Sequence, residues 1–257
     1  MLKKGRLFLA VTIIFVLSIG IAFSVPLEDC KEYAKLGVPG LQGKLLCRKG
    51  YLLSHSAEKK TPIWVIEQLT IAKLDGPYPR KDEFRADPDI PEGERAETKD
   101  YTKISPFVRG HMAPADDFHW DEIAMEECFY LSNMVPQDGK MNGGIWKGLE
   151  NRCRDWTKRR DEIYIFMGPI YQGGVKQTIG GNKVAVPTHL YKIIYDPKKR
   201  EAIAFIIPNE PLYTKDLPRY IVSIREAEER TGLDFLSNLE LSLQNRVERK
   251  KAQAPWK

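Results

Sequence analysis

His111 is one of four histidines in the chain and lies in the segment KISPFVRGHMAPADDF, residues 103–118. An imidazole has a pKa of about 6.5 when nothing perturbs it, so it can take a proton from water at neutral pH. The same side chain can also bind a metal ion or pack in a core. This segment alone does not distinguish the three roles, so the residues that follow it are needed.

A set of polar side chains recurs every four residues further along, at Asn142, Trp146, Glu150 and Arg154. An α-helix has about 3.6 residues per turn, so each step of four drifts by only ~40° and the side chains follow one stripe. Glu150 and Arg154 alone are explained as well by an exposed i,i+4 ion pair. That pair does not explain an amide at the start of the helix and an indole one turn later. With the histidine on one extended segment and Asn133 at the end of the next, the pattern predicts a ββα module.

These residues resemble those of the DNA/RNA non-specific endonuclease family, which includes endonuclease G-like and secreted bacterial nucleases and is built around a ββα-metal finger. The family's Asp-Arg-Gly-His signature reads Val108-Arg109-Gly110-His111 here, and its Asn-x-x-Pro-Gln motif begins at Asn133. Its metal-binding asparagine, tryptophan, glutamate and second arginine fall in order on the four residues of the stripe. Similar flanking segments, among them PIWVIEQLT and VPTHLYKIIYD, extend the resemblance from about residue 50 to residue 239.

The resemblance implies that His111 is the general base of phosphodiester hydrolysis and that Asn133 holds the imidazole or the nearby backbone in place. It also implies that Asn142 is the protein ligand of a magnesium ion, for which manganese can substitute. Magnesium prefers octahedral oxygen coordination and keeps most of its waters, so one neutral amide oxygen is an adequate ligand.

Three further residues take roles from the resemblance. Glu150 is expected to order water around the ion. Arg109 and Arg154 are expected to face phosphate or to brace Glu150, although arginines on helices and near turns often serve structure alone. Trp146 is expected to be a packing element rather than a platform on which bases stack.

The sequence departs from the family pattern at two places. Val108 replaces the first acid of the signature, so whatever that acid supports is missing or supplied elsewhere. The family also has a phosphate-contacting arginine upstream. Arg80 and Arg85 are both close to that position and neither aligns cleanly, so the role stays unassigned.

The implied function is endonucleolytic hydrolysis of DNA and RNA with little sequence specificity, leaving 5′-phosphate ends. A site that contacts phosphate and metal rather than base edges has little means to read sequence. The alternative is a catalytically decayed nucleic-acid-binding or host-interaction protein on the same scaffold, which Val108 invites and the intact His111, Asn142 and Glu150 oppose. A more selective HNH-type endonuclease would need an extra DNA-reading region, and none is visible.

The elements that must position these residues belong to one α+β domain with a mostly antiparallel sheet and packed helices. The chain has 257 residues, of which 42% are apolar, enough for one core of moderate size. β-Branched and aromatic runs predict strands at residues 50–54, 62–69, 127–134, 162–167, 183–195 and 201–207. Helices are predicted over residues 142–159 and 217–231, and a long functional loop over residues 76–100. The domain is expected to span residues 50–243, after a lead-in of residues 25–49 and before a frayed basic tail of residues 244–257.

Residues 1–24 have the layout of a secretory signal peptide. Three basic residues precede an uncharged apolar run from Leu7 to Phe23, and an uncleaved membrane anchor is the alternative. The protein is therefore expected to be secreted or periplasmic, and to contact a membrane only if this segment is retained. The formal charge of +5 includes these three residues, so the rest of the chain carries about +2, a mild bias and not that of a DNA-coating protein.

The four cysteines lack the CxxC spacing of a zinc site, and in an oxidising compartment they could form two disulfides. The expected pairs are Cys30–Cys47 and Cys128–Cys153. The second pair would clamp the predicted strand before Asn133 to the helix that follows. Two buried free thiols are the alternative for that pair.

Overall fold

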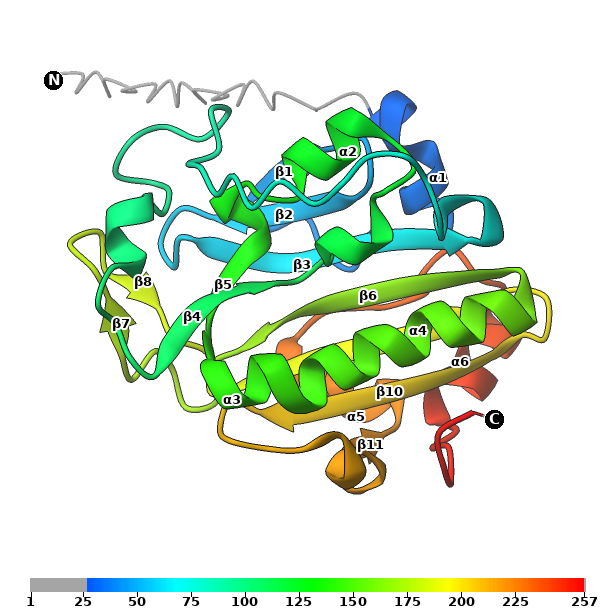
Figure 1. Cartoon of the computed structure of the whole chain (residues 1–257). Helices are drawn as coiled ribbons and strands as arrows, with labels where there is room; N and C mark the ends of the chain where they lie inside the picture. Colours follow the sequence, from blue (N-terminus) through cyan, green and yellow to red (C-terminus); the bar gives the residue numbers. More distant parts are fainter. Residues whose placement is uncertain (1–26, 257) are drawn as a thin grey trace, which may run out of the picture.

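A seven-stranded antiparallel sheet forms the centre of the computed structural model, which describes residues 27–256 (Figure 1). The strand order is β1-β2-β3-β6-β9-β10-β11, and each neighbouring pair is antiparallel. The strands are β1 (Lys44–Cys47), β2 (Leu52–Ser56), β3 (Thr61–Thr70), β6 (Glu162–Ile170), β9 (His189–Asp196), β10 (Glu201–Pro208) and β11 (Ile221–Val222). The predicted leader of residues 1–24 lies outside the described residues.

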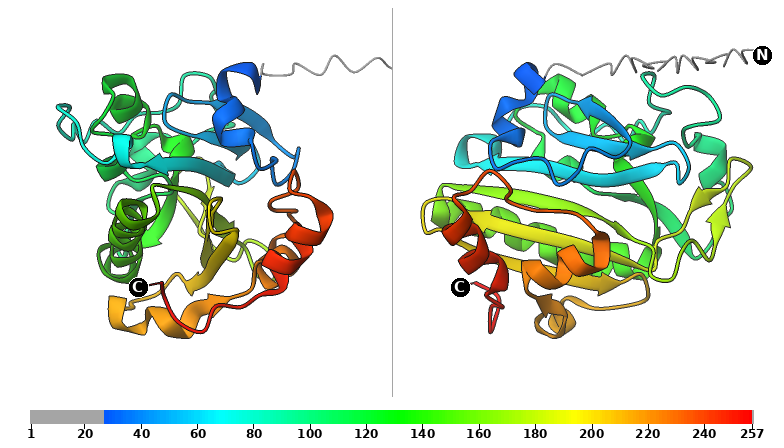
Figure 2. Two further views of the ribbon diagram at one scale, coloured as in Figure 1. Left: turned by 90° about the vertical axis from the view of Figure 1, so that its right-hand side faces the viewer. Right: turned by 180° about the vertical axis from the view of Figure 1, so that it is seen from behind.

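Both faces of the sheet are buried. Because successive side chains of a strand point to opposite faces, each strand contributes residues to two cores. In β3, Val65 and Leu69 enter one core, while Trp64 and Ile66 enter the other. Helices α2 (Glu122–Glu127) and α4 (Lys147–Arg160) cover the first face. Helices α1 (Lys31–Ala34), α5 (Ile224–Thr231) and α6 (Leu241–Arg249) cover the second (Figure 2).

Smaller elements flank this sheet. Strand β4 (Phe107–His111) pairs with β5 (Met134–Asp138), and β7 (Thr178–Ile179) pairs with β8 (Val184–Ala185). A short helix α3 (Gly139–Met141) and a five-residue π-helix (Asn142–Trp146) lead directly into α4. Six 3₁₀ segments complete the described elements: Leu27–Cys30, Ile71–Lys73, Thr98–Tyr101, Ala115–Asp117, Leu131–Asn133 and Thr214–Tyr220.

The predicted α+β architecture is confirmed. The hairpin of β2 and β3 around residues 57–60, the strands β6 and β10 and the helix after residue 142 are all present, whereas the strand predicted over residues 183–195 is divided into β8 and β9, which lie in different sheets. The predicted helix over residues 217–231 begins only at Ile224, because a 3₁₀ segment and the short strand β11 occupy its first half. It ends as expected at Gly232, which adopts a left-handed conformation with φ of 72°.

The predicted strand over residues 127–134 is wrong. Residues 122–127 form helix α2, whose N-cap Asp121 accepts a hydrogen bond from the backbone N–H of Ala124 at 2.9 Å. A turn and a 3₁₀ segment follow, so Asn133 precedes a strand instead of ending one. Only Glu127 of the predicted strand belongs to α2, and the largely buried run from Cys128 to Asn133 forms the turn and the 3₁₀ segment, which bury residues of the same types as a strand.

The prediction of a frayed tail from Gln244 is also wrong. Helix α6 extends to Arg249, and Trp256 then returns to the domain. Its ring stacks edge-on against Trp156 at 5.3 Å and lies 3.7 Å from the guanidinium of Arg160. Its backbone oxygen accepts a hydrogen bond from Nε1 of Trp156 at 2.9 Å. The basic composition of the tail gave no indication that Trp256 packs against the domain.

One of the two predicted disulfides is present. Cys30 and Cys47 are bonded, which ties α1 to strand β1. The predicted Cys128–Cys153 bridge is wrong, since both are free and buried. Cys128 follows a helix rather than starting a strand, and its thiol is turned back to donate to the backbone oxygen of Met125 at 3.0 Å.

Within residues 27–256, every helix is too short or too polar to cross a membrane.

Candidate active site

The predicted ββα module is formed by β4, β5 and the helical run from α3 to α4 (Figure 1). His111 is the last residue of β4 and lies opposite Met134 at the start of β5. At the end of β5, the Asp138 side chain accepts hydrogen bonds from the backbone N–H groups of Lys140 and Met141 at 2.9 and 3.0 Å. This cap starts the helical run at the point where Asn142 faces the histidine strand.

A cleft of about 410 Å³ lies between these elements and the loop after His111. Four of the six predicted site residues line it, namely Arg109, His111, Asn142 and Glu150, whereas Asn133 and Arg154 do not. The cleft also contains side chains to which the sequence assigned no role: Arg80, Asp116 and Lys147. The lining is thus a histidine, an amide, two carboxylates and three cations.

His111 is held as a neutral imidazole. Its ring packs edge-on against Phe129 at 5.2 Å and tilted against Phe84 at 5.5 Å, and the residue is 8% exposed. Burial, followed by the positive charges of Arg80 and Arg109, lowers the pKa of His111 to about 3. Its Nε2 has no hydrogen-bond partner among the described residues. Because this Nε2 is shielded from solvent, a neutral His111 would have to accept a proton from water at Nδ1.

The backbone at His111 is fixed from two sides. Its carbonyl oxygen accepts hydrogen bonds from Nε1 of Trp146 at 3.2 Å and from Nε2 of Gln137 at 3.4 Å. The indole of Trp146 is fully buried, as expected of a packing element. Gly110 is required beside it, because a Cβ there would lie 2.1 Å from Cδ of Gln137.

Asn133 holds the backbone just after His111 and makes no contact with the imidazole. Its Nδ2 donates to the carbonyl oxygens of Ala113 and Cys128, both at 2.9 Å. Its Oδ1 accepts from the backbone N–H of Ala113 at 3.0 Å. The side chain is fully buried, so these three bonds satisfy groups that water cannot reach.

The oxygen atoms of the cleft fit a hard divalent cation. Asn142 is half-buried at the first residue of the π-helix, and its side chain makes no hydrogen bond with residues 27–256. Glu150 lines the same cleft and likewise makes no hydrogen bond or ion pair with the described residues. Carboxylate and amide oxygens are the ligands that Mg²⁺ takes in proteins.

Glu150 is poised between its two protonation states. Burial raises the pKa of Glu150 to about 7, against the opposing positive charge of Lys192. Lys192 is fully buried on β9, where its ammonium lies 4.5 Å from the ring of Trp146. No sequence signal indicated this lysine, since it lies within an apolar strand pattern.

Arg154 does not form the i,i+4 pair with Glu150 that its spacing suggested. It contacts the loop after His111 instead, with Nη1 2.7 Å from Oδ1 of Asp117 and Nη2 3.5 Å from Oδ2 of Asp116. Asp117 is 1% exposed, so the guanidinium neutralises a buried carboxylate. Asp117 belongs to the segment MAPADDF, for which the sequence predicted no ion-pair partner.

Strand alternation separates the residues of the signature. Arg109 and His111 point to the cleft side of β4, and Arg109 lies 4.2 Å from the ring of Phe84. Val108 points to the other side, is 38% exposed and does not line the cleft. The replacement of the family's acid therefore lies away from the reacting groups.

The structure distinguishes the two upstream arginines. Arg80 lines the cleft, where Nε donates to Asp82 at 2.8 Å and the guanidinium lies 5.4 Å from the ring of Phe129. Arg85 instead lies over the ring of Tyr130 at 4.7 Å and does not reach the cleft. The sequence does not show which of the two arginines enters the cleft, because a loop rich in proline and charged residues has no periodicity that indicates where each side chain points.

The fold and the cleft together define a ββα-metal nuclease, and comparison with known proteins gives the family. The family model for DNA/RNA non-specific endonucleases matches residues 31–242. The chain belongs to the DNA/RNA non-specific endonuclease family.

Individual relatives agree. The chain is 40% identical to the mitochondrial nuclease EXOG of Xenopus laevis, over 74% of this chain and 57% of the relative. It is 38% identical to nuclease C1 of Cunninghamella echinulata var. echinulata, over 83% and 91% of the two chains. A crystal structure of the EndoG/EndoGI complex contains a chain that superposes with a TM-score of 0.77 at 31% identity, over 82% of this chain and 93% of that one. The chain spans between 57% and 64% of the length of the EXOG relatives from frog, zebrafish and human.

Proposed function

We propose that the protein is a divalent-metal-dependent endonuclease that hydrolyses phosphodiester bonds of DNA and RNA with little sequence preference. The observation that carries the proposal is a neutral, buried imidazole in one cleft with an uncommitted amide and carboxylate. The three cations of the cleft complement a polyanionic backbone. No Phe, Tyr or Trp side chain lines the cleft within the described residues, so the contacts favour phosphate over bases.

In the proposed reaction His111 takes a proton from water as the water oxygen bonds to phosphorus. The bond from phosphorus to the 3′ oxygen breaks, and that oxygen leaves and takes a proton from solvent, so the other fragment keeps a 5′-phosphate. Asn142 would hold magnesium, or manganese in its place, and Glu150 would order the water around the ion, which would supply positive charge to the departing oxygen. Arg80, Arg109 and Lys147 would contact phosphate oxygens through charge-assisted hydrogen bonds.

Two structural residues would keep this arrangement in place. Asn133 fixes the backbone after His111, and Arg154 fixes the loop that carries Asp116 and Asp117. We infer that Arg154 acts by positioning this loop and that Arg80 takes the phosphate contact left unassigned in the sequence.

We also propose that the protein is exported. The disulfide between Cys30 and Cys47 supports an oxidising compartment. Relatives named as mitochondrial make a mitochondrial address the competing one. An uninterrupted apolar run after three basic residues favours a secretory leader over an amphipathic, Arg-rich transit peptide.

The test uses supercoiled plasmid and RNA with magnesium or with EDTA. We expect the wild-type protein to degrade both substrates only with the metal, and the His111→Ala variant to degrade neither. His189→Ala is the matched control, because that histidine lies on β9 outside the cleft and should leave activity unchanged. Binding of nucleic acid without cleavage by the wild-type protein would favour the decayed scaffold.

A further inference from the structure

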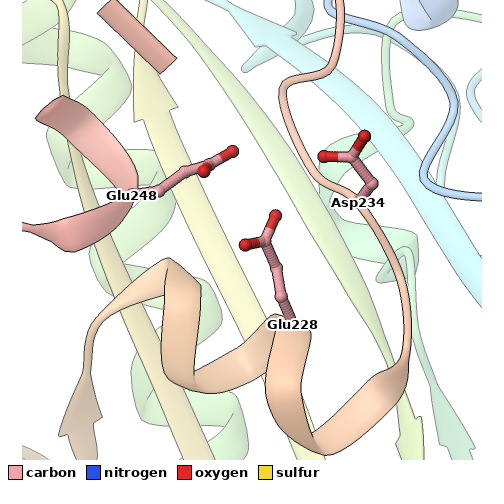
Figure 3. Close-up of side chains that lie close together, drawn as sticks. All are labelled: Glu228, Asp234 and Glu248. Atoms are coloured by element: carbon pink, nitrogen blue, oxygen red, sulfur yellow. The ribbon is translucent and has the colours of Figure 1, made fainter. Parts of the chain in front are cut away.

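Three carboxylates converge on the face of the sheet opposite the cleft (Figure 3). Glu228 comes from the end of α5, Asp234 from the loop that follows, and Glu248 from the end of α6. One oxygen from each lies within 4.8 Å of the other two. In Figure 3 the three side chains point toward a common centre from three separate segments.

Two of these acids are buried and incompletely paired. Glu248 is 0% exposed, and its Oε1 has no hydrogen-bond partner among the described residues. Glu228 is 8% exposed and accepts one hydrogen bond at Oε1, from the backbone N–H of Phe235 at 3.0 Å. A buried carboxylate oxygen without a donor is costly, so this arrangement calls for a further positive group.

A single arginine compensates only part of the charge. Arg225 Nη2 lies 2.6 Å from Oε2 of Glu248, and Nη1 lies 3.0 Å from Oε2 of Glu228. It is the only cation among residues 27–256 that forms an ion pair with the cluster. When all three carboxylates are ionised, one guanidinium leaves a net charge of about −2, the charge that one divalent cation neutralises.

We propose that Glu228, Asp234 and Glu248 form a calcium site that fastens α6 to α5. Calcium takes six to eight oxygen ligands in flexible geometry, and carboxylates are its usual protein ligands. Asp234 is exposed, so water can complete the coordination on that side. Arg225 pairs with Oε2 of both glutamates and Gln244 Nε2 donates to Oδ1 of Asp234 at 3.0 Å, so the unpartnered Oε1 of Glu248 is left for the ion.

The site has a structural consequence beyond its own ligands. Helix α6 ends one residue after Glu248, and the chain then carries Trp256 to its stack on Trp156 of α4. Helix α4 also carries Glu150 of the cleft. Calcium would therefore stabilise the tail that packs against the helix of the proposed active site.

The test measures calcium binding by the full-length chain in an Asn142→Ala background, so that the cleft contributes no cation site. We expect isothermal titration to show one calcium per chain, and thermal unfolding to shift to higher temperature as calcium is added. Asp234→Asn should weaken binding about tenfold or more, since affinity follows the number of charged ligands. Glu229→Gln is the matched control, because it removes an exposed charge from the next position of α5 and should leave binding unchanged.

Calcium binding that is absent in the Asn142→Ala protein would overturn the proposal. Binding that is equally strong with and without Asp234→Asn would overturn it as well. Glu248→Gln is a second variant. If this buried substitution prevents folding, the exposed Asp234→Asn variant still tests the site. The result does not depend on nuclease activity, so the proposed function and the calcium site can fail separately.

Discussion

The two asparagines of the ββα module should respond oppositely to replacement by alanine. Asn133 makes three hydrogen bonds to buried backbone groups, whereas Asn142 makes none with its side chain among the described residues. We expect Asn133→Ala to lower the free energy of unfolding and Asn142→Ala to lower the rate of cleavage. The pair separates a residue that builds the site from one that acts in it.

The magnitude for Asn133 follows from the groups left without partners. Its removal strands the N–H and C=O of Ala113 and the C=O of Cys128, both fully buried residues. Each unsatisfied buried group costs about 1–3 kcal/mol, so three would cost ~3–9 kcal/mol without relaxation. Water entering the space left by the amide would reduce this cost, and we expect a loss of about 4 kcal/mol. That is a large part of the 5–15 kcal/mol typical of a folded domain, so this variant should be close to unfolding at 37 °C.

The measurement combines urea denaturation with plasmid cleavage. For Asn142→Ala we expect a change in unfolding free energy within about 0.5 kcal/mol, as at a position without buried contacts. Its cleavage rate should fall at least about a hundredfold, which corresponds to ~2.7 kcal/mol of activation free energy. A loss below about 1 kcal/mol for Asn133→Ala, or equal losses for both variants, would refute this assignment of roles.

Three further predictions concern the pH dependence of cleavage, the ion pair between Arg154 and Asp117, and the packing of Trp256. In the metal-free protein burial raises the pKa of Glu150 to about 7 while the pKa of His111 is lowered to about 3, so at subsaturating magnesium kcat/KM should rise with pH as Glu150 ionises. This rise of kcat/KM with pH should vanish in Glu150→Gln. A rise that persists in that variant would mean that another group titrates. Arg154→Met leaves the carboxylate of Asp117 buried and unpaired, and should cost about 3–5 kcal/mol in urea unfolding. Asp117→Asn should recover part of that loss, which would not happen if the two side chains acted independently. Truncation before Trp256 removes its stack at the end of α4 and should cost about 2 kcal/mol, seen as a lower melting temperature and altered tryptophan fluorescence.

Local periodicity predicted the parts of the fold that depend on neighbouring residues. The apolar, β-branched runs of β3, β6 and β10 reflect burial on both faces, and these strands are where expected. The prediction over residues 127–134 is wrong because a short apolar run has the same composition in a strand and in a buried turn or 3₁₀ segment. The packing of Trp256 is not predicted by the sequence, because a single tryptophan in a basic tail belongs to no periodic pattern.

Side-chain partners could not be read from spacing. Arg154 is four residues from Glu150, yet its guanidinium pairs with Asp117, 37 positions away. Cys128 and Cys153 flank the predicted module but remain free thiols. Spacing along a helix limits which groups can meet, whereas the loop packed against that helix decides which of them do.

The sequence by itself determined the identity and order of the candidate site residues, through motif order, helical spacing and the resemblance to a nuclease family. It brought His111, Asn142 and Glu150 into one hypothesis without any coordinates. Only the tertiary structure decided the charge that these groups carry. The neutral state of His111 depends on rings and arginines from distant segments, and the pKa of Glu150 depends on burial and on Lys192 from the central sheet. The exclusion of water and the placement of charges are set by packing between segments far apart in the sequence, so they follow from the fold.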